Sequence, residues 1–180
     1  KYYKMAIDKG YPKAMHNYAW ILQQGNGVPV NYTEAIKYYK MAIDKGDSNA
    51  MYHYGCMLQD GQGVPVDNRE AIKYYKMAIK KDHPGAMIDY ALMLRNGIGV
   101  SVNYGEAIKY FRMAIAKGHP DAMLQYASMQ HHGIGVPVDY EEAIKYYKMA
   151  IDKEQSDAMY QYGTMLQNGE GVPVNFNEAI

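Results

Sequence analysis

Paired glycines in short loops are the first residues in this chain that could do chemistry. GNGVPV stands at residues 25–30, and GQGVPV, GIGVSV, GIGVPV and GEGVPV follow at 61–66, 97–102, 133–138 and 169–174. Two glycines one residue apart can let a backbone approach a phosphate, but a nucleotide-binding loop also needs a third glycine or a Gly-Lys-Ser/Thr ending. None of the five copies has either feature, and the copies recur every 36 residues. The loops therefore indicate a repeated structural unit rather than a nucleotide site.

The single cysteine is the next candidate for chemistry. Cys56 is preceded by His53 on the same predicted helical arc, where the imidazole could act as a base for the thiol. The sequence supplies no third group to orient the base and no oxyanion site. We therefore expect Cys56 to be a contact residue, and we expect no catalytic residue and no enzyme activity in this chain.

Six histidines raise the question of a metal site. His131 and His132 are sequence neighbours, and neighbours on a helix point about 100° apart, so they do not converge on one ion. His83 and His119 each precede a proline and are expected to be helix caps or filler. Spacings such as Cys-x₂-Cys or His-x₃-His do not occur. The sequence therefore predicts no metal and no cofactor.

Composition excludes several classes of partner. Formal net charge is zero and the pI is near neutral, so no overall field attracts the chain to nucleic acid or to an acidic membrane. No apolar run approaches the roughly 18 residues of a membrane span, so we expect no membrane insertion. The first ten residues, KYYKMAIDKG, recur at 37–46, and the chain stops at NEAI, where another such segment would begin. We expect a fragment of a longer chain, which leaves the compartment undetermined between the cytoplasm, which is favoured, and a secretory compartment.

Each 36-residue repeat is predicted to contain two helices. In the first repeat, apolar residues recur at intervals of three and four over 14–24 and 34–45, which is typical of helices and not of strands. The first helix stops at the glycine of the loop, and the second begins with Asn or Asp followed three residues later by Glu, as in a capping box. Helices of about 12 residues are marginal alone, so neighbouring repeats must stabilise them by packing. We expect one repeat array, with residues 1–11 ending an earlier repeat, complete repeats at 12–47, 48–83, 84–119 and 120–155, and a truncated repeat at 156–180.

This helix-turn-helix pattern resembles the Sel-one-like repeat, which is related to the tetratricopeptide repeat. In the first repeat the resemblance rests on Ala14, Ala19, Leu22, Gly25, Gly27, Val28, Ala35, Tyr38, Ala42 and Gly46. Two departures are an exchange of Leu and Tyr at Tyr18 and Leu22, and Tyr38 where Trp is common; Gly46 also becomes Asp82 and Glu154 in later repeats, which should alter those turns. The resemblance implies an all-α fold, a right-handed superhelical α-solenoid of antiparallel helix pairs. It also implies an adaptor for protein complexes, with the first helices lining the concave side.

One face of the first helix differs from repeat to repeat. It comprises positions 13, 16, 17, 20, 23 and 24 and their counterparts at intervals of 36, which fall within about 120° on a helical wheel. Large apolar residues on this variable face are expected to be exposed anchors for a partner, because packing does not need that side; the alternative is that an exposed surface simply drifts. The predicted partner-binding residues are Lys13, His16, Trp20, Gln23, Tyr52, Cys56, Ile88, Leu92, Arg95, Asp121, Leu124, Ser128, His131, Tyr160 and Thr164.

The sequence therefore predicts a non-catalytic scaffold or adaptor that binds a peptide or protein on the concave face. Two alternatives stay open. A structural solenoid could assemble end to end through its open ends. An RNA-binding helical repeat could use the row of lysines on the second helices, but nucleic acid is disfavoured because the chain is neutral and a glutamate precedes members of that row by three residues.

Overall fold

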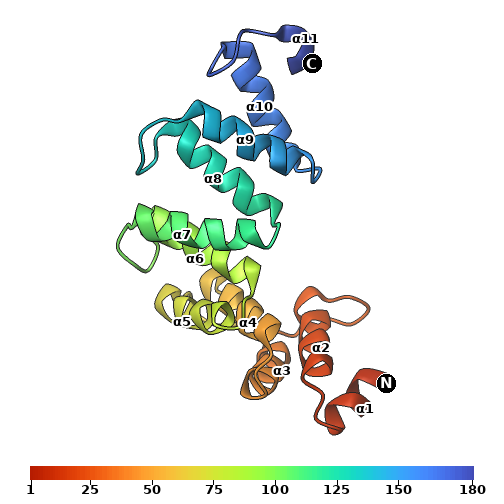
Figure 1. The fold of residues 1–180 in the computed structure, drawn as a ribbon. Coiled ribbons are helices and arrows are strands. Elements are labelled where there is room, and N and C mark those ends of the chain that lie inside the picture. Colours follow the sequence, from red (N-terminus) through yellow and green to blue (C-terminus); the bar gives the residue numbers. More distant parts are fainter. The chain divides into compact units, whose positions relative to one another are not determined.

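The structure is a computed structural model that describes all residues 1–180, and it contains helices and no strands. The predicted all-α fold of helix-turn-helix repeats is confirmed (Figure 1). No helix combines the length and the apolar character that crossing a membrane requires. The helices are α1 (Tyr2–Asp8), α2 (Pro12–Gln24), α3 (Tyr32–Asp44), α4 (Ser48–Asp60), α5 (Asn68–Ile79), α6 (Pro84–Asn96), α7 (Tyr104–Ala116), α8 (Pro120–His132), α9 (Tyr140–Ile151), α10 (Ser156–Asn168) and α11 (Phe176–Ala179).

The chain divides into two compact units, which are described separately. Unit 1 comprises Lys1–Tyr90 with Ile98–Val100, and unit 2 comprises Ala91–Gly97 with Ser101–Ile180. Within unit 1, α2 packs against α3, α3 against α4, and α4 against α5. Within unit 2, α7 packs against α8, α8 against α9, and α9 against α10. The same succession of helices therefore builds both units.

The paired glycines of the loops have structural roles. The first ends a helix in the left-handed conformation, as at Gly25 with φ of 73°. In every loop after the first, the second glycine lies against the preceding repeat: a Cβ on Gly63 would collide with Tyr32, and one on Gly135 would collide with Tyr104. These loops are thus closed by a contact that only glycine permits, which supports the structural interpretation of the motif.

The second helices begin with the predicted side-chain caps. The carboxylate or amide oxygen of the Asn or Asp accepts a hydrogen bond from the backbone N–H of the Glu three residues later, at 2.9–3.2 Å in all five repeats. His83 also caps a helix, because its Nδ1 accepts from Ala86 N at 3.1 Å. His119 forms no such bond.

The turns at Asp82 and Glu154 keep the backbone conformation of their glycine counterparts, so the expectation that the substitution alters these turns is wrong. Both residues keep the left-handed backbone, with φ of 63° and 61°. The helices that precede them, α5 and α9, have 12 residues, whereas α3 and α7 have 13. The substitution therefore shortens the helix by one residue and leaves the turn conformation in place.

The core is built from the residues that repeat. The second helices bury alanines completely, as at Ala35 and Ala42. Between these alanines, each of the four complete repeats buries an aromatic ring that is at most 1% exposed. That ring is Tyr39, Tyr75, Phe111 or Tyr147. Three of these rings carry a hydroxyl into the interior, where it needs a hydrogen-bond partner.

Basic residues of the second helices lie over tyrosines of the following repeat. Lys40 Nζ is 5.3 Å from the centroid of the Tyr54 ring, and Lys148 Nζ is 5.0 Å from that of Tyr162. Arg112 Nη2 also donates to Tyr126 Oη at 2.7 Å. These cations are held by cation–π and hydrogen-bond contacts within the chain.

Candidate functional site

A surface hollow in unit 2 is lined entirely by the variable face. Its volume is about 370 Å³, and its walls come from α8 and α10. The lining residues are Leu124, Gln125, Ser128, Asp157, Tyr160 and Gln161. All six occupy positions at which the repeats differ, and five of them lie outside the buried core; only Leu124 is also part of it.

The hollow has an apolar floor and a polar rim. Leu124 is 8% exposed, whereas the Tyr160 side chain is 72% exposed. The amide oxygen of Gln125 accepts a hydrogen bond from Arg95 Nη1 at 2.7 Å, which leaves its NH₂ group as the end that can donate. An apolar floor with a few convergent polar groups is the usual composition of a ligand site.

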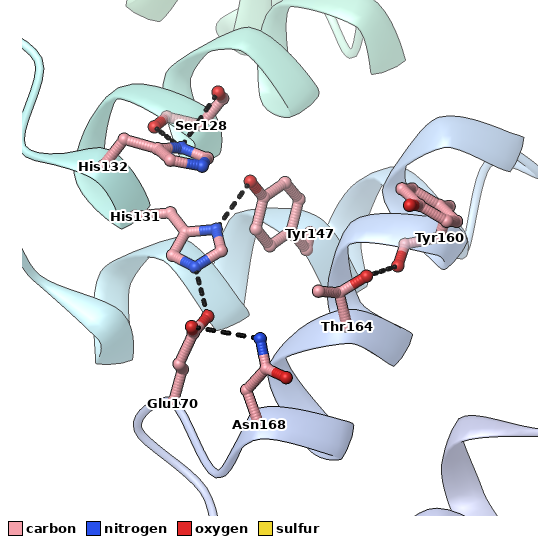
Figure 2. A network of polar contacts seen from close by, with 8 residues as sticks. All are labelled: Ser128, His131, His132, Tyr147, Tyr160, Thr164, Asn168 and Glu170. Carbon is pink, nitrogen blue, oxygen red and sulfur yellow. Dashed lines mark hydrogen bonds and ion pairs between the residues drawn. The ribbon is translucent and has the colours of Figure 1, made fainter.

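Beside the hollow, a polar network joins three elements of unit 2 (Figure 2). His131 Nε2 lies 2.7 Å from Glu170 Oε2, and His131 Nδ1 lies 3.4 Å from Tyr147 Oη. Asn168 Nδ2 donates to the other carboxylate oxygen of Glu170 at 3.2 Å. The hydrogen bond from His131 holds the pKa of Glu170 below its ordinary value, and burial raises the pKa of Tyr147 to about 12. His131 therefore ties the buried tyrosine of α9 to the loop that follows α10.

Unit 1 contains the neutral counterpart of this network. Tyr39 Oη donates to Gln23 Oε1 at 2.7 Å, and Gln23 Nε2 donates to Gln62 Oε1 at 2.7 Å. Gln23 and Gln62 occupy the positions of His131 and Glu170 one hundred and eight residues earlier. In both units a side chain of the first helix connects the buried ring to the next loop.

The prediction placed Gln23 and His131 on an exposed surface as partner contacts, and this exposure is wrong. Each side chain is only 8% exposed and is bonded to a buried tyrosine. The physical reason is that a tyrosine hydroxyl cannot be buried without a partner. The repeats carry a signal of this: where Phe111 replaces the tyrosine and has no hydroxyl, Arg95 replaces the glutamine and bonds Gln125 instead.

The variable face of unit 1 is covered by a row of rings. The rings of His16 and His53 stack with centroids 5.2 Å apart, and those of Tyr52 and His83 stack at 4.5 Å. His53 and Tyr52 join the two pairs at 5.1 Å. Burial, aided by the charges of the neighbouring histidines, lowers the pKa of His53 to about 4, and burial also lowers that of His16. His16 and His53 are therefore neutral at physiological pH.

The predicted apolar anchors divide into exposed and buried ones. Trp20 is 40% exposed and Tyr160 is 72% exposed, whereas Tyr52 and Leu92 are half-buried. Ile88 and Leu124 are 6% and 8% exposed, so the expectation that they are exposed is wrong. Their position borders the packed face of the helix, and an aliphatic side chain there folds onto the core, as Leu124 does beside Met123 and Ala127.

The remaining predicted residues lie at the surface or at its margin. Thr164 Oγ1 donates to the backbone oxygen of Tyr160 at 3.0 Å, and Asp121 Oδ1 accepts from Gln155 Nε2 at 2.5 Å. Lys13 is exposed, while His16, Arg95 and Ser128 are half-buried. The structure adds three members of the variable face that the prediction did not select: Gln125, Asp157 and Gln161.

The surroundings of Cys56 oppose nucleophilic catalysis. Burial raises the pKa of the thiol to about 11, and Tyr75 Oη donates to Cys56 Sγ at 3.5 Å. His53, the conceivable base, lies among other rings and has a pKa of about 4. A reactive cysteine needs the opposite environment, one that favours the thiolate. No group of three or more His, Cys, Asp or Glu residues is placed to hold a metal ion.

Comparison with known proteins identifies the repeat. The chain matches the family described as Sel1 repeat over residues 12–47, 48–83, 84–119, 120–154 and 156–180. No curated protein matches the chain.

Solved structures of similar proteins share the fold. A Sel1 repeat protein from Oxalobacter formigenes is 30% identical, with a TM-score of 0.89 over 94% of this chain and 69% of that one. A protective antigen from uropathogenic Escherichia coli that displays the same repeat fold is 26% identical, with a TM-score of 0.85 over 98% of this chain. This chain spans only 38% of the length of that antigen. An immunity protein from Pseudomonas aeruginosa, 22% identical with a TM-score of 0.65 over 95% of this chain and 62% of that one, shares the fold alone.

The repeat matches cover most of the chain, and they coincide with helix pairs whose caps, loop glycines and buried alanines recur. The chain belongs to the Sel1 repeat family.

Proposed function

We propose that this chain is a non-catalytic scaffold that binds a peptide or protein segment on the variable face of its first helices. The observation that carries the proposal is the hollow of α8 and α10, whose six lining residues are all at positions the repeat does not fix. Five of the six lie outside the buried core, and the sixth, Leu124, packs onto the core beneath the hollow. The hollow is the contact that we assign to the partner in unit 2, and the exposed Trp20 is the contact that we assign in unit 1.

The family supports this class of function. Sel1 repeat proteins generally act as scaffolds for protein interactions, and they typically bind proteins. The concave placement of the first helices, implied by the resemblance, would present the variable face to a bound segment. Large aromatic residues such as Trp20 and Tyr160 are the types that most often carry binding energy at interfaces.

The second helices give no comparable support to RNA binding. Their lysines and arginine lie over tyrosine rings, and Lys73 and Lys145 each pair with a glutamate of their own helix at 2.9 and 3.3 Å. RNA-binding surfaces instead present cations to phosphates, and their affinity falls steeply with salt.

The test begins with peptides selected from a random displayed library against the immobilised chain. Their affinities are then measured by fluorescence anisotropy for the parent chain and for variants. Tyr160→Ala is expected to weaken binding of peptides that use unit 2 by about tenfold, the usual loss of an aromatic interface anchor. Trp20→Ala should do the same for peptides that use unit 1.

Phe176→Ala is the matched control, because Phe176 on α11 is 59% exposed and lies off the variable face. It should leave every affinity unchanged. Far-ultraviolet circular dichroism should show that all three variants keep their helices. Selected peptides that bind both Tyr160→Ala and Trp20→Ala as tightly as the parent chain would place the binding surface elsewhere and contradict the proposal.

A further inference from the structure

The hollow of unit 2 contains a carboxylate that no group of the chain neutralises. Asp157 is exposed in the first turn of α10, and its backbone N–H, not its carboxylate, is the group that bonds Gln155. Arg95 is the one lysine or arginine on the variable face of this unit, and it directs Nε to Asn96 and Nη1 to Gln125. The acid is therefore available to a ligand, while the neighbouring acids Asp121 and Glu170 are already bonded to Gln155 and His131.

The walls beside Asp157 suit a long side chain with a charged end. Leu124 forms an apolar floor, and Tyr160 presents an exposed aromatic ring. Aliphatic stems of lysine and arginine pack on such surfaces, and their cationic ends are attracted both to ring faces and to carboxylates. The amides of Gln125 and Gln161 stand at the same rim and can bond a peptide backbone.

One of the residues that line the hollow, Ser128, has a small side chain. Ser128 occupies the position that Trp20 fills on α2, and Asp157 occupies the position of Asn49 on α4. In unit 1 the corresponding surface is therefore occupied by an indole and the stacked rings of His16 and His53, and it has no acid at the position of Asp157. At the equivalent positions of unit 1, Trp20 fills the space of Ser128 and Asn49 replaces the charge of Asp157.

We propose that the hollow of α8 and α10 binds the side chain of a lysine or arginine in the partner peptide, with its stem on Leu124 and Tyr160 and its charged end on the Asp157 carboxylate. This inference rests on the proposed function, since it names the residue type that the variable face of unit 2 selects. In this proposal the Asp157 carboxylate selects a basic side chain, and the small side chain of Ser128 leaves room for it.

Two variants taken from the chain's own repeats separate these roles. Asp157→Asn copies Asn49, so it removes the charge and keeps the shape. Ser128→Trp copies Trp20, so it fills the hollow and keeps the charge. Both residue types already stand at equivalent places in a folded repeat, so we expect both variants to fold, and circular dichroism checks this directly.

The probes are the Nα-acetyl amides of arginine, lysine, norleucine and glutamate, titrated into the ¹⁵N-labelled chain and followed by amide chemical shifts of α8 and α10. Arginine and lysine derivatives should bind at least about tenfold more tightly than norleucine, the difference expected for a charge-assisted contact. Asp157→Asn should reduce their affinity to that of norleucine, and Ser128→Trp should abolish binding of all three. Glutamate should not bind.

Failure of this inference can be told apart from failure of the proposed function. If norleucine or glutamate binds as tightly as arginine, or if Asp157→Asn has no effect, the selection of a basic residue is wrong, while library peptides that depend on Tyr160 would still support the scaffold. If the derivatives perturb neither α8 nor α10 and no library peptide depends on Tyr160 or Trp20, both proposals are overturned. Enrichment of lysine and arginine among Tyr160-dependent peptides supports both.

Discussion

The first-helix faces of the two units are built on the same register but held together by different chemistry. Unit 1 uses a neutral amide bridge, Tyr39–Gln23–Gln62, and covers its face with histidine and tyrosine rings. Unit 2 uses an ionisable bridge through His131 to Glu170 and leaves a hollow at Ser128. The comparison teaches that the repeat fixes the position of each side chain. The residue type at that position then decides whether it bridges a buried tyrosine to a loop, covers the surface or leaves a hollow.

The difference also predicts which unit responds to mild acid. Unit 1 buries a neutral histidine, His53, whose pKa is lowered from 6.5 to about 4. Unit 2 depends on Glu170, whose pKa is held below its ordinary 4.5 and which therefore stays ionised above that pH. Between pH 6.5 and about 4, protonation therefore opposes folding at His53 but not at Glu170.

The largest expected effect is a loss of stability in unit 1 as the pH falls through this window. The unfolded chain binds a proton at His53 near pH 6.5 and the folded chain only near 4, so the unfolded state binds more protons in between and stability falls with pH. A shift of that size corresponds to on the order of 3 kcal/mol, complete near pH 4 and absent above 6.5. Hydrogen exchange of α2 and α4 amides, measured against pH, reports it.

His53→Gln is the control, because Gln125 and Gln161 occupy the same position in unit 2. It should remove most of the pH dependence of unit 1 between pH 6.5 and 4. His16 and His83, whose charges help lower the pKa of His53, remain in the variant, as does Asp47, which opposes the shift. An equal loss of protection in α8 and α10 over the same range would contradict the assignment to the histidine row.

A second, smaller effect tests the bridges directly. His131→Leu leaves the Tyr147 hydroxyl buried without its imidazole partner and should destabilise unit 2 by about 2 kcal/mol. His131→Gln copies Gln23 and should retain most of the stability, because an amide can bond both the tyrosine and the loop residue as it does in unit 1. Urea denaturation of the two variants gives the comparison, and equal destabilisation by leucine and glutamine would show that the bridge is not what His131 contributes.

Local features of the fold follow from the sequence, because they depend on neighbours in the chain. The cap at Asn31 needs only Glu34 three residues away, and the helix end at Gly25 needs only a residue that tolerates positive φ. Asp82 shows the same locality, since its turn keeps the left-handed backbone of the glycine it replaces. These interactions recur with the 36-residue period, so comparing repeats within one chain was enough to predict them.

From the sequence, the site could be predicted only as one variable face of the first helices. A helical wheel places position 16 at the margin of the packed surface, and it cannot say that Leu124 turns inward while Tyr160 stays out. The partner of His131 is a tyrosine 16 residues away on another helix. Whether the face holds a hollow depends on the volume of Ser128 against its packed surroundings, which is a tertiary property. The sequence shows that Arg95 occurs with Phe111, whereas glutamine or histidine occurs with tyrosine in the other complete repeats. The reason becomes clear only from the hydrogen bond between the two side chains.

The smallest expected effect probes that covariation in the third repeat, where α7 carries Phe111 and α6 carries Arg95. Phe111→Tyr introduces a buried hydroxyl opposite an arginine already bonded to Gln125, and it should destabilise unit 2 by about 1 kcal/mol. Adding Arg95→Gln restores the pair found at Gln59 and Tyr75, whose hydroxyl donates to the amide at 2.8 Å, and should recover most of that loss. Urea denaturation of the two single variants and the double variant completes a double-mutant cycle. A coupling energy near zero would mean that the tyrosine and the glutamine recur independently. The hydrogen bond to the buried tyrosine would then not be the reason why glutamine or histidine occupies this position of the variable face in the other repeats.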